Sequence, residues 1–123
     1  EEFLEIARRQ DVGIMARSVV MRGALTSRRA FLPAALKDVH RCADALEAIA
    51  LTNGMTLPEM AYRYLLSQAG PITALVGTAK VEELEAAAAC SDAGPLNESV
   101  MAEIRAVAVQ DRSLLDLSRW PSS

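Results

Sequence analysis

A guanidinium, a hydroxyl and a glycine follow a short apolar run near the start of the sequence. Residues 12–16 read Val-Gly-Ile-Met-Ala and lead directly into Arg17 and Ser18, with Gly23 five residues further on. An uncharged run of this kind predicts a strand buried on both faces, as in a parallel sheet covered by helices. Polar groups at the carboxyl end of such a strand can form a binding site. From these residues alone, the simpler interpretation is a strand end at which Arg17 pairs with a neighbouring carboxylate.

Other reactive side chains have simpler explanations. Glu82, Glu83 and Glu85 look like a carboxylate site, but they fall in the first turns of an expected helix, where the helix dipole favours acidic residues. His40, the only histidine, is expected on a helix in a solvated or capping role. The sequence therefore predicts neither a catalytic residue nor a metal ligand in this chain.

The elements that position these residues are expected in the order helix, strand, helix, helix, strand, helix, helix. The expected N-caps are Thr56 and Asn97, and Gly54 is the expected C-terminal cap. Residues 23–35 are expected to be loop, and the tail from about residue 111 shows no clear period. Strands that alternate with helices predict a parallel sheet, and only two strands predict a piece of a larger fold. The expected ranges are 1–10, 12–17, 34–53, 56–69, 72–76 and 81–91, then a last helix from 97 whose apolar stripe includes Val107 and Ala108.

Length and composition limit the function. A chain of 123 residues, 51% hydrophobic and with a net charge of −3, fits one domain or part of one. Mild acidity and few aromatic residues argue against a nucleic-acid surface, and no apolar run approaches the roughly 20 residues of a membrane span. The first residues do not read as a signal peptide. Cys42 and Cys90 lie far apart, which predicts reduced thiols in a cytoplasmic protein; a disulfide between them is the open alternative.

Two segments resemble the aldo-keto reductase family. VGIMARSVVMRGALT, residues 12–26, is similar to the family's seventh strand and the loop after it. GMTLPEMAYRYLLSQAGPITALVGTAKVEELEAAAA, residues 54–89, is similar to the next helix, the eighth strand and the start of the eighth helix. The resemblance extends over about residues 3–110. It implies an α/β fold that is the C-terminal portion of a (β/α)₈ barrel, incomplete as a barrel, with two parallel strands and about five helices in one partial domain over residues 1–123.

The resemblance also implies a cofactor, NADP(H), and a small carbonyl substrate such as an aldehyde, a ketone or a sugar. Arg17 lies where many members have an aromatic ring that stacks on the nicotinamide, and Ser18 is expected to offer its hydroxyl to the nicotinamide end or a phosphate. The backbone of residues 20–23 is expected to wrap the pyrophosphate, and residues 77–79 to face the adenosine 2′-phosphate. The expected cofactor-binding residues are Arg17, Ser18, Val20, Arg22, Gly23, Gly77, Thr78, Ala79 and Glu83.

Some positions depart from the family pattern. Val19 stands in place of a proline, and Glu83 stands where arginine or glutamine is frequent. The charge of Glu83 would repel a phosphate. Ala86 and Ala87 replace a Glu-Asn pair that often contacts adenine. The choice between NADP and NAD is therefore open, and we expect weak or absent cofactor binding by this chain.

The family's catalytic tyrosine, aspartate, lysine and histidine belong to the first half of the barrel. Tyr62 and Tyr64 do not match that tyrosine, so we expect the chain alone to be inactive. Two functions remain. One is the cofactor-binding part of an NAD(P)H-dependent aldo-keto reductase, and the other is an inactive fragment that serves as a structural or interaction module.

Incomplete packing predicts self-association. Unpaired strand edges, together with apolar helix faces that include Leu36, Val39, Leu46 and Ile49, are expected to join copies of the chain in a homo-oligomer. Trp120 is expected either to shape the barrel mouth or to pack on the side of the barrel.

Overall fold

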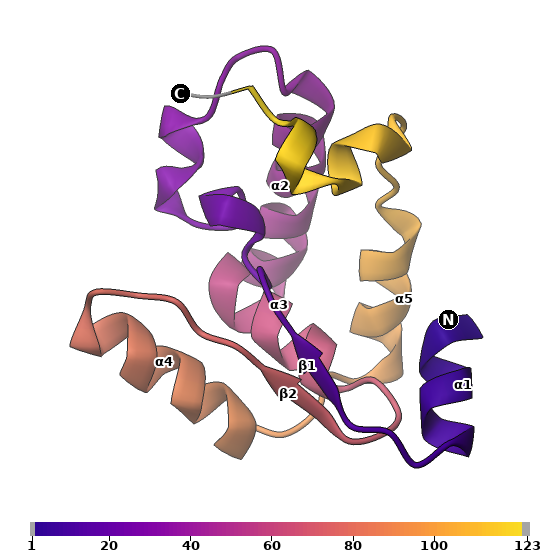
Figure 1. Ribbon diagram of the computed structural model, residues 1–123. Coiled ribbons are helices and arrows are strands. Elements are labelled where there is room, and N and C mark those ends of the chain that lie inside the picture. Colours follow the sequence, from indigo (N-terminus) through magenta and orange to yellow (C-terminus); the bar gives the residue numbers. More distant parts are fainter. Residues whose placement is uncertain (1, 122–123) are drawn as a thin grey trace.

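The computed structural model describes residues 2–121; Glu1 of the expected first helix and residues 122–123 of the expected tail lie outside the described residues. The order of helices and strands is the predicted one (Figure 1). These elements are α1 (Glu2–Arg9), β1 (Ile14–Ala16), α2 (Lys37–Thr52), α3 (Leu57–Leu66), β2 (Ile72–Ala74), α4 (Val81–Asp92) and α5 (Glu98–Ala106). Short 3₁₀ helices add η1 (Met21–Gly23), η2 (Ser27–Phe31), η3 (Arg112–Leu115) and η4 (Leu117–Arg119).

Local sequence explains where the helices begin and end. The Thr56 hydroxyl accepts a hydrogen bond from the Glu59 N–H at 3.3 Å, which caps α3 as predicted. The Asn97 side chain accepts one from the Val100 N–H at 2.9 Å and caps α5 in the same way. Gly54, just beyond α2, has a φ of +69°, a left-handed conformation that glycine adopts without strain.

The two strands pair in parallel, as predicted. Ile14 lies opposite Ile72 and Ala16 opposite Ala74. The Ile14 N–H donates to the Pro71 carbonyl at 2.9 Å, and the Leu75 N–H donates to the Ala16 carbonyl at 2.8 Å. Because the strands run in the same direction and Ala16 lies opposite Ala74, both strands end at the same edge of the sheet. The segments after residues 16 and 74 therefore start side by side.

The prediction that the strands are buried on both faces is wrong. Ile14, Ala16, Ile72 and Ala74 are half-buried on the side of the helices, whereas the Met15 side chain between them is 71% exposed. Successive side chains of a strand point to opposite faces, and Thr73, which lies opposite Met15, is exposed as well, so this second face is open to solvent. A closed barrel would cover that face with other strands.

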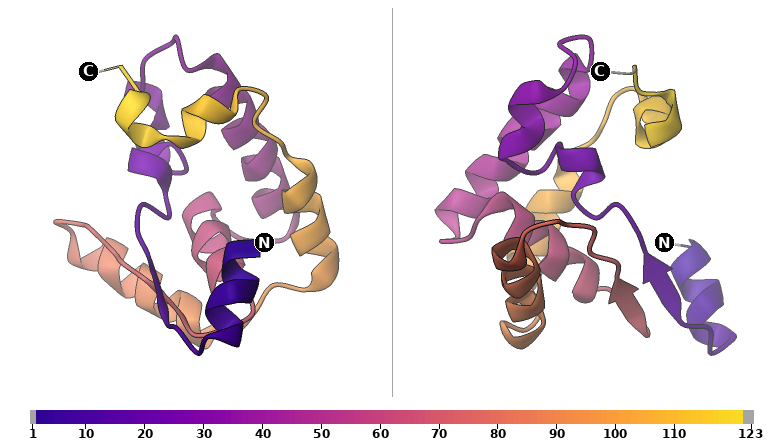
Figure 2. Two further views of the ribbon diagram at one scale, coloured as in Figure 1. Left: turned by 45° about the vertical axis from the view of Figure 1, so that its right-hand side comes forward. Right: turned by 60° about the vertical axis from the view of Figure 1, so that its left-hand side comes forward.

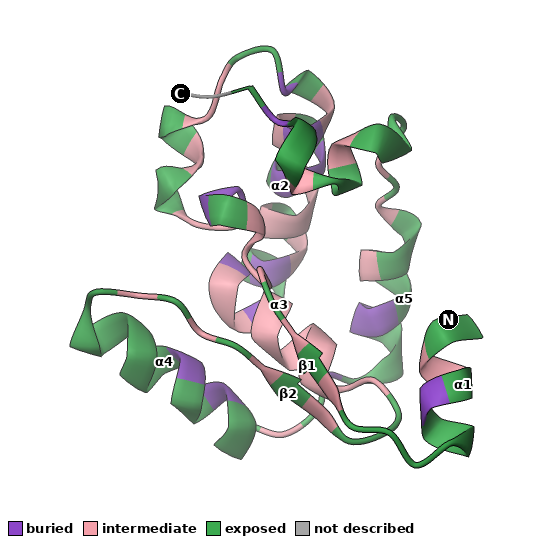
Figure 3. Ribbon diagram, viewed as in Figure 1, coloured by how far each residue is buried: buried purple, intermediate pink, exposed green. Residues whose placement is uncertain are grey.

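The core lies between the helices (Figure 3). Helix α3 packs against β2, α4 and α2, and α2 also packs against α5. Much of α4 is exposed, with Ala87 and Cys90 buried. The larger buried cluster joins α2, α3 and α5 and consists of Ala50, Leu57, Met60, Leu96, Val100 and Met101. Leu46 and Ile49 pack against this cluster.

A second buried cluster joins the loop after β1, the start of α2 and the C-terminal tail. Leu36 and Val39 are buried together with Ala24 and Trp120, so the prediction that they form an exposed apolar face is wrong. The tail, which shows no period in the sequence, folds into η3 and η4 and brings Trp120 onto the first turn of α2 and the loop after β1.

Element boundaries differ slightly from those expected. Helix α2 begins at Lys37 rather than at residue 34, and η1 and η2 occupy part of the segment expected to be loop. Val107 and Ala108 lie beyond α5 and do not belong to its apolar stripe, since Val107 is already extended at the end of that helix.

Both cysteines, Cys42 and Cys90, are buried and free, so they do not form a disulfide with one another. Burial raises the pKa of each thiol above its ordinary value. Within residues 2–121, no helix combines the length and the apolar character needed to cross a membrane.

Candidate functional site

The carboxyl end of β1 presents Arg17 and Ser18 at the point where the polypeptide leaves the sheet. Arg17 is exposed, and its guanidinium makes no hydrogen bond or ion pair with another described residue. The pairing of Arg17 with a neighbouring carboxylate, the alternative considered from the sequence, is therefore absent from the described part of the chain. An uncompensated guanidinium at this edge is available for an anion or a planar ring.

The loop that follows β1 turns in an uncommon backbone conformation. Ser18, Met21 and Arg22 have φ values of +59°, +46° and +52°, and Gly23 has +93°. Residues other than glycine rarely occupy this region, and they cluster in it at binding and catalytic sites. The turn closes on itself, because the Met21 N–H donates to the Ser18 carbonyl at 2.8 Å and the Gly23 N–H to the Val20 carbonyl at 3.0 Å.

Some N–H groups of this loop stay available to a ligand. Those of Val19, Val20 and Arg22 donate no hydrogen bond to any described residue. Gly23 is buried, and a Cβ at that position would lie 3.0 Å from the Cβ of Arg28, so the loop packs too tightly there for a side chain. Successive backbone N–H groups in a left-handed turn are a general way of binding an anion.

The segment after β2 forms a second polar group around Glu83. The Glu83 carboxylate accepts a hydrogen bond from the Thr78 hydroxyl and lies 3.6 Å from the Lys80 Nζ. The Thr78 hydroxyl in turn accepts one from the Lys80 N–H at 3.1 Å. The Thr78 hydrogen bond and the nearby cations hold the pKa of Glu83 below its ordinary value, so this carboxylate is ionised at neutral pH.

Arg28 connects the two groups. Its Nη2 lies 4.0 Å from the Glu83 carboxylate, so η2, which belongs to the loop after β1, approaches the start of α4. This contact links the loop after β1 to the segment after β2 through Arg28 and Glu83. Sequence reasoning missed Arg28; a cation five residues after Gly23 was the available signal.

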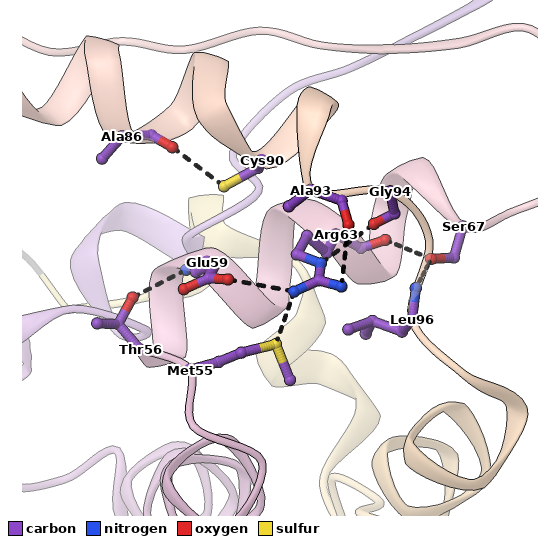
Figure 4. A network of polar contacts seen from close by, with 10 residues as sticks. All are labelled: Met55, Thr56, Glu59, Arg63, Ser67, Ala86, Cys90, Ala93, Gly94 and Leu96. Atoms are coloured by element: carbon purple, nitrogen blue, oxygen red, sulfur yellow. Dashed lines mark hydrogen bonds and ion pairs between the residues drawn. The ribbon is translucent and has the colours of Figure 1, made fainter.

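A network around Arg63 holds α4 and the segment after it against α3 (Figure 4). The guanidinium donates to the Gly94 carbonyl at 3.1 Å and to the Glu59 carboxylate at 3.2 Å. The Ser67 hydroxyl accepts from the Leu96 N–H at 2.8 Å and donates to the Arg63 carbonyl. This network fixes the end of α4, whose first turn carries Glu83.

Among residues 2–121, no group of three or more His, Cys, Asp or Glu side chains could hold a metal ion.

Parallel strands that alternate with helices, with polar loops at the carboxyl ends of the strands, define an α/β protein of the βα-repeat class. The sequence model of the Aldo/keto reductase family matches residues 1–109. The chain belongs to the aldo/keto reductase family and contains part of its domain, so the two strands and five helices are part of a (β/α)₈ barrel. A comparison with curated proteins gave no match.

Proposed function

We propose that this chain is the cofactor-binding part of an NAD(P)H-dependent aldo-keto reductase that acts on an aldehyde, a ketone or a sugar. The observation that carries the proposal is the parallel register of Ala16 opposite Ala74, in a chain of this family. Because of this register, the loops that follow β1 and β2 begin at the same edge of the sheet. Barrel enzymes bind their ligands at this edge, the carboxyl ends of the strands.

The nicotinamide and pyrophosphate end of a dinucleotide fits the residues after β1. Arg17 offers an uncompensated guanidinium, and Val20 offers an N–H without an intramolecular acceptor. Ser18 would add its hydroxyl, and the buried Gly23 keeps the loop compact. When bound, the cofactor supplies hydride to a carbonyl carbon. The role of these residues is to bind and orient it, since phosphate oxygens are held well by backbone N–H groups together with a cation.

The adenosine end of a dinucleotide fits the segment after β2 less well. A Cβ at Gly77 would meet no atom within 4 Å, but the Thr78 hydroxyl and the Lys80 ammonium already interact with Glu83. A 2′-phosphate placed there would meet the negative charge of that carboxylate. We therefore propose binding through the pyrophosphate end and no strong preference for NADP(H).

A second candidate function rests on a different observation. Met15 on β1 is 71% exposed in a sheet of two strands, and an open sheet edge with an exposed apolar side chain favours association with another chain. An inactive fragment would use such a surface as a structural or interaction module.

Nucleotide titration followed by two-dimensional NMR tests the proposed function. We expect weak binding of NADH and NADPH, with resonance shifts in residues 17–23 and 77–80. Arg17→Ala is expected to weaken binding about tenfold, which is typical of a lost hydrogen bond to a charged group. Arg9→Ala is the matched control, because it removes an exposed arginine whose partner is Glu5 on α1.

Equal affinity of the wild type and Arg17→Ala would remove Arg17 from the site. If neither nucleotide shifts any resonance, the chain does not bind the cofactor, and the interaction module becomes the better explanation.

A further inference from the structure

The C-terminal tail contacts the loop after β1 at two points. Arg22 Nη1 donates to the Leu117 carbonyl at 2.9 Å, which joins residues 95 positions apart in the sequence. Trp120, only 6% exposed, packs in the cluster that contains Ala24 from the same loop. Figures 1 and 2 show the yellow tail beside the purple segment that follows β1 in each view.

The start of the tail is anchored separately, on α2. The Asp38 carboxylate accepts hydrogen bonds from the N–H groups of Gln110 and Asp111. Arg41 Nη2 donates to the Ala108 carbonyl at 2.8 Å. With both ends held, the tail crosses from α2 to the loop in a fixed position.

The tail is also rigid within itself. The Trp120 indole N–H donates to the Leu114 carbonyl at 2.8 Å, and the carboxylates of Asp111 and Asp116 cap η3 and η4. A preformed segment loses less conformational entropy when it holds another segment in place than a flexible one does.

The loop needs such support because its own residues disfavour its conformation. Met21 and Arg22 are left-handed in succession, and each carries a side chain that makes this backbone costly. Strained backbone of this kind persists only where the surroundings fix it. The Arg22 contact is the one side-chain hydrogen bond between the described tail and this strained turn.

We propose that the tail, residues 112–120, is a clamp that holds the loop 18–25 in its left-handed turn, and that Arg22 is the positioning residue through which the clamp acts. In the intact reductase this would preset the loop for its ligand, a consequence that rests on the proposed function. In this proposal the Arg22 guanidinium binds the tail and not the cofactor. Arg22 supports cofactor binding indirectly, because it keeps the backbone N–H groups of the loop in position.

Amide hydrogen exchange of Gly23, Ala24 and Leu25 tests the clamp in the full chain without nucleotide. Arg22→Ala removes the contact and keeps the backbone strain, so we expect exchange about five- to tenfold faster, as a lost hydrogen bond produces. Arg22→Gly removes the same contact but relieves the strain, because glycine accepts this φ. We expect Arg22→Gly to recover most of the protection that Arg22→Ala loses, and Arg22→Lys, which keeps a donor, to stay within about twofold of the wild type.

The control and a second readout come from the tail itself. Arg119→Ala removes an exposed arginine that pairs with Asp116 within the tail, and we expect wild-type exchange in the loop. Fluorescence of Trp120, the single tryptophan, reports tail docking; emission is expected to shift to the red in Arg22→Ala and not in Arg119→Ala.

Wild-type exchange in Arg22→Ala would overturn the proposal. Equal acceleration in Arg22→Ala and Arg22→Gly would overturn it as well, because the contact would then not act on the strained backbone. Both measurements are made without nucleotide, so they test the clamp alone. A failure of the clamp can therefore be distinguished from a failure of the proposed function.

Discussion

Glu83 is the residue at which this chain departs most clearly from a site built for a phosphate. Its carboxylate is ionised and engages a hydroxyl, Thr78, and two cations, Lys80 and Arg28. Under the proposed function, those groups would be the donors nearest to a 2′-phosphate. A ribose 2′-hydroxyl, by contrast, can donate to a carboxylate, as it does at the acidic residue of NAD-binding α/β proteins.

Substitution of Glu83 by glutamine should therefore change the nucleotide preference. Glu83→Gln is expected to raise the affinity for adenosine 2′,5′-bisphosphate relative to adenosine 5′-monophosphate by about fivefold. This factor corresponds to roughly 1 kcal/mol, the repulsion between two charges 4 Å apart in water. Isothermal titration or NMR shifts with the two nucleotides provide the measurement. Glu82→Gln is the control, since Glu82 neighbours Glu83 but contacts none of these three donors. An unchanged ratio in Glu83→Gln would mean that this carboxylate does not face the ribose.

At the scale of elements, predictions that depended on local chemistry were confirmed. The caps Thr56 and Asn97 and the left-handed Gly54 each act within a few residues of their own position, so the sequence pattern was sufficient to find where α3 and α5 begin and where α2 ends. The parallel pairing of β1 and β2 followed from the alternation of strands and helices. The binding role of the residues that follow these strands stays a prediction.

Contacts between distant segments could not be predicted in this way. Leu36 is buried in a cluster with Trp120, which lies 84 residues away in the sequence. The hydrophobic periodicity of a single helix does not predict contacts over such a separation. The left-handed φ of Met21 and Arg22 was equally hidden, because neither residue type favours it. Arg28 reaches Glu83 only because two separate loops converge.

The attachment of the tail to α2 should depend on pH. The side-chain hydrogen bond from Arg41 lowers the pKa of Asp38 below its ordinary value, and the N–H groups of Asp111 and Gln110 act in the same direction. A lowered folded-state pKa adds stability above the unfolded value, near pH 4, and that stability is lost as the pH falls through the folded-state value. Trp120 fluorescence should therefore shift to the red below about pH 4.

Asp38→Asn separates this effect from general acid unfolding. We expect the variant to show weaker tail docking at neutral pH and a smaller acid-dependent change. The change should not vanish, because the pKa values of Asp111 and Asp116 in the tail are also lowered by their serine partners. The control is Asp92→Asn, at the exposed end of α4, which is expected to show the same acid-dependent change in Trp120 fluorescence as the wild type. An identical acid transition in Asp38→Asn and the wild type would show that this anchor does not hold the tail.

At the scale of the whole molecule, the described chain presents a sheet with two unpaired edges and one uncovered face. Each strand pairs with the other only, so its second edge carries free N–H and C=O groups. Met15 projects from the uncovered face and is 71% exposed. The exposed apolar residues also include Phe3, Ile6, Val12, Phe31 and Leu75. Leu36 and Val39 are buried, so we expect the open sheet that carries Met15, not the Leu36 and Val39 face expected from the sequence, to mediate association.

We expect the 123-residue chain to self-associate at micromolar concentration through this sheet. Apolar area removed from water contributes about 25 cal/mol per Å², and strand edges pair readily when no charge or proline protects them. Met15→Lys places a charge on the uncovered face beside an open edge and should shift the mass measured by light scattering toward the monomer. Leu51→Lys is the matched control: Leu51 is 70% exposed but lies at the end of α2, and the variant should keep the wild-type mass. A monomeric wild type with a cooperative melt would show that two strands and five helices are sufficient alone, and equal loss of association in both variants would place the contact elsewhere.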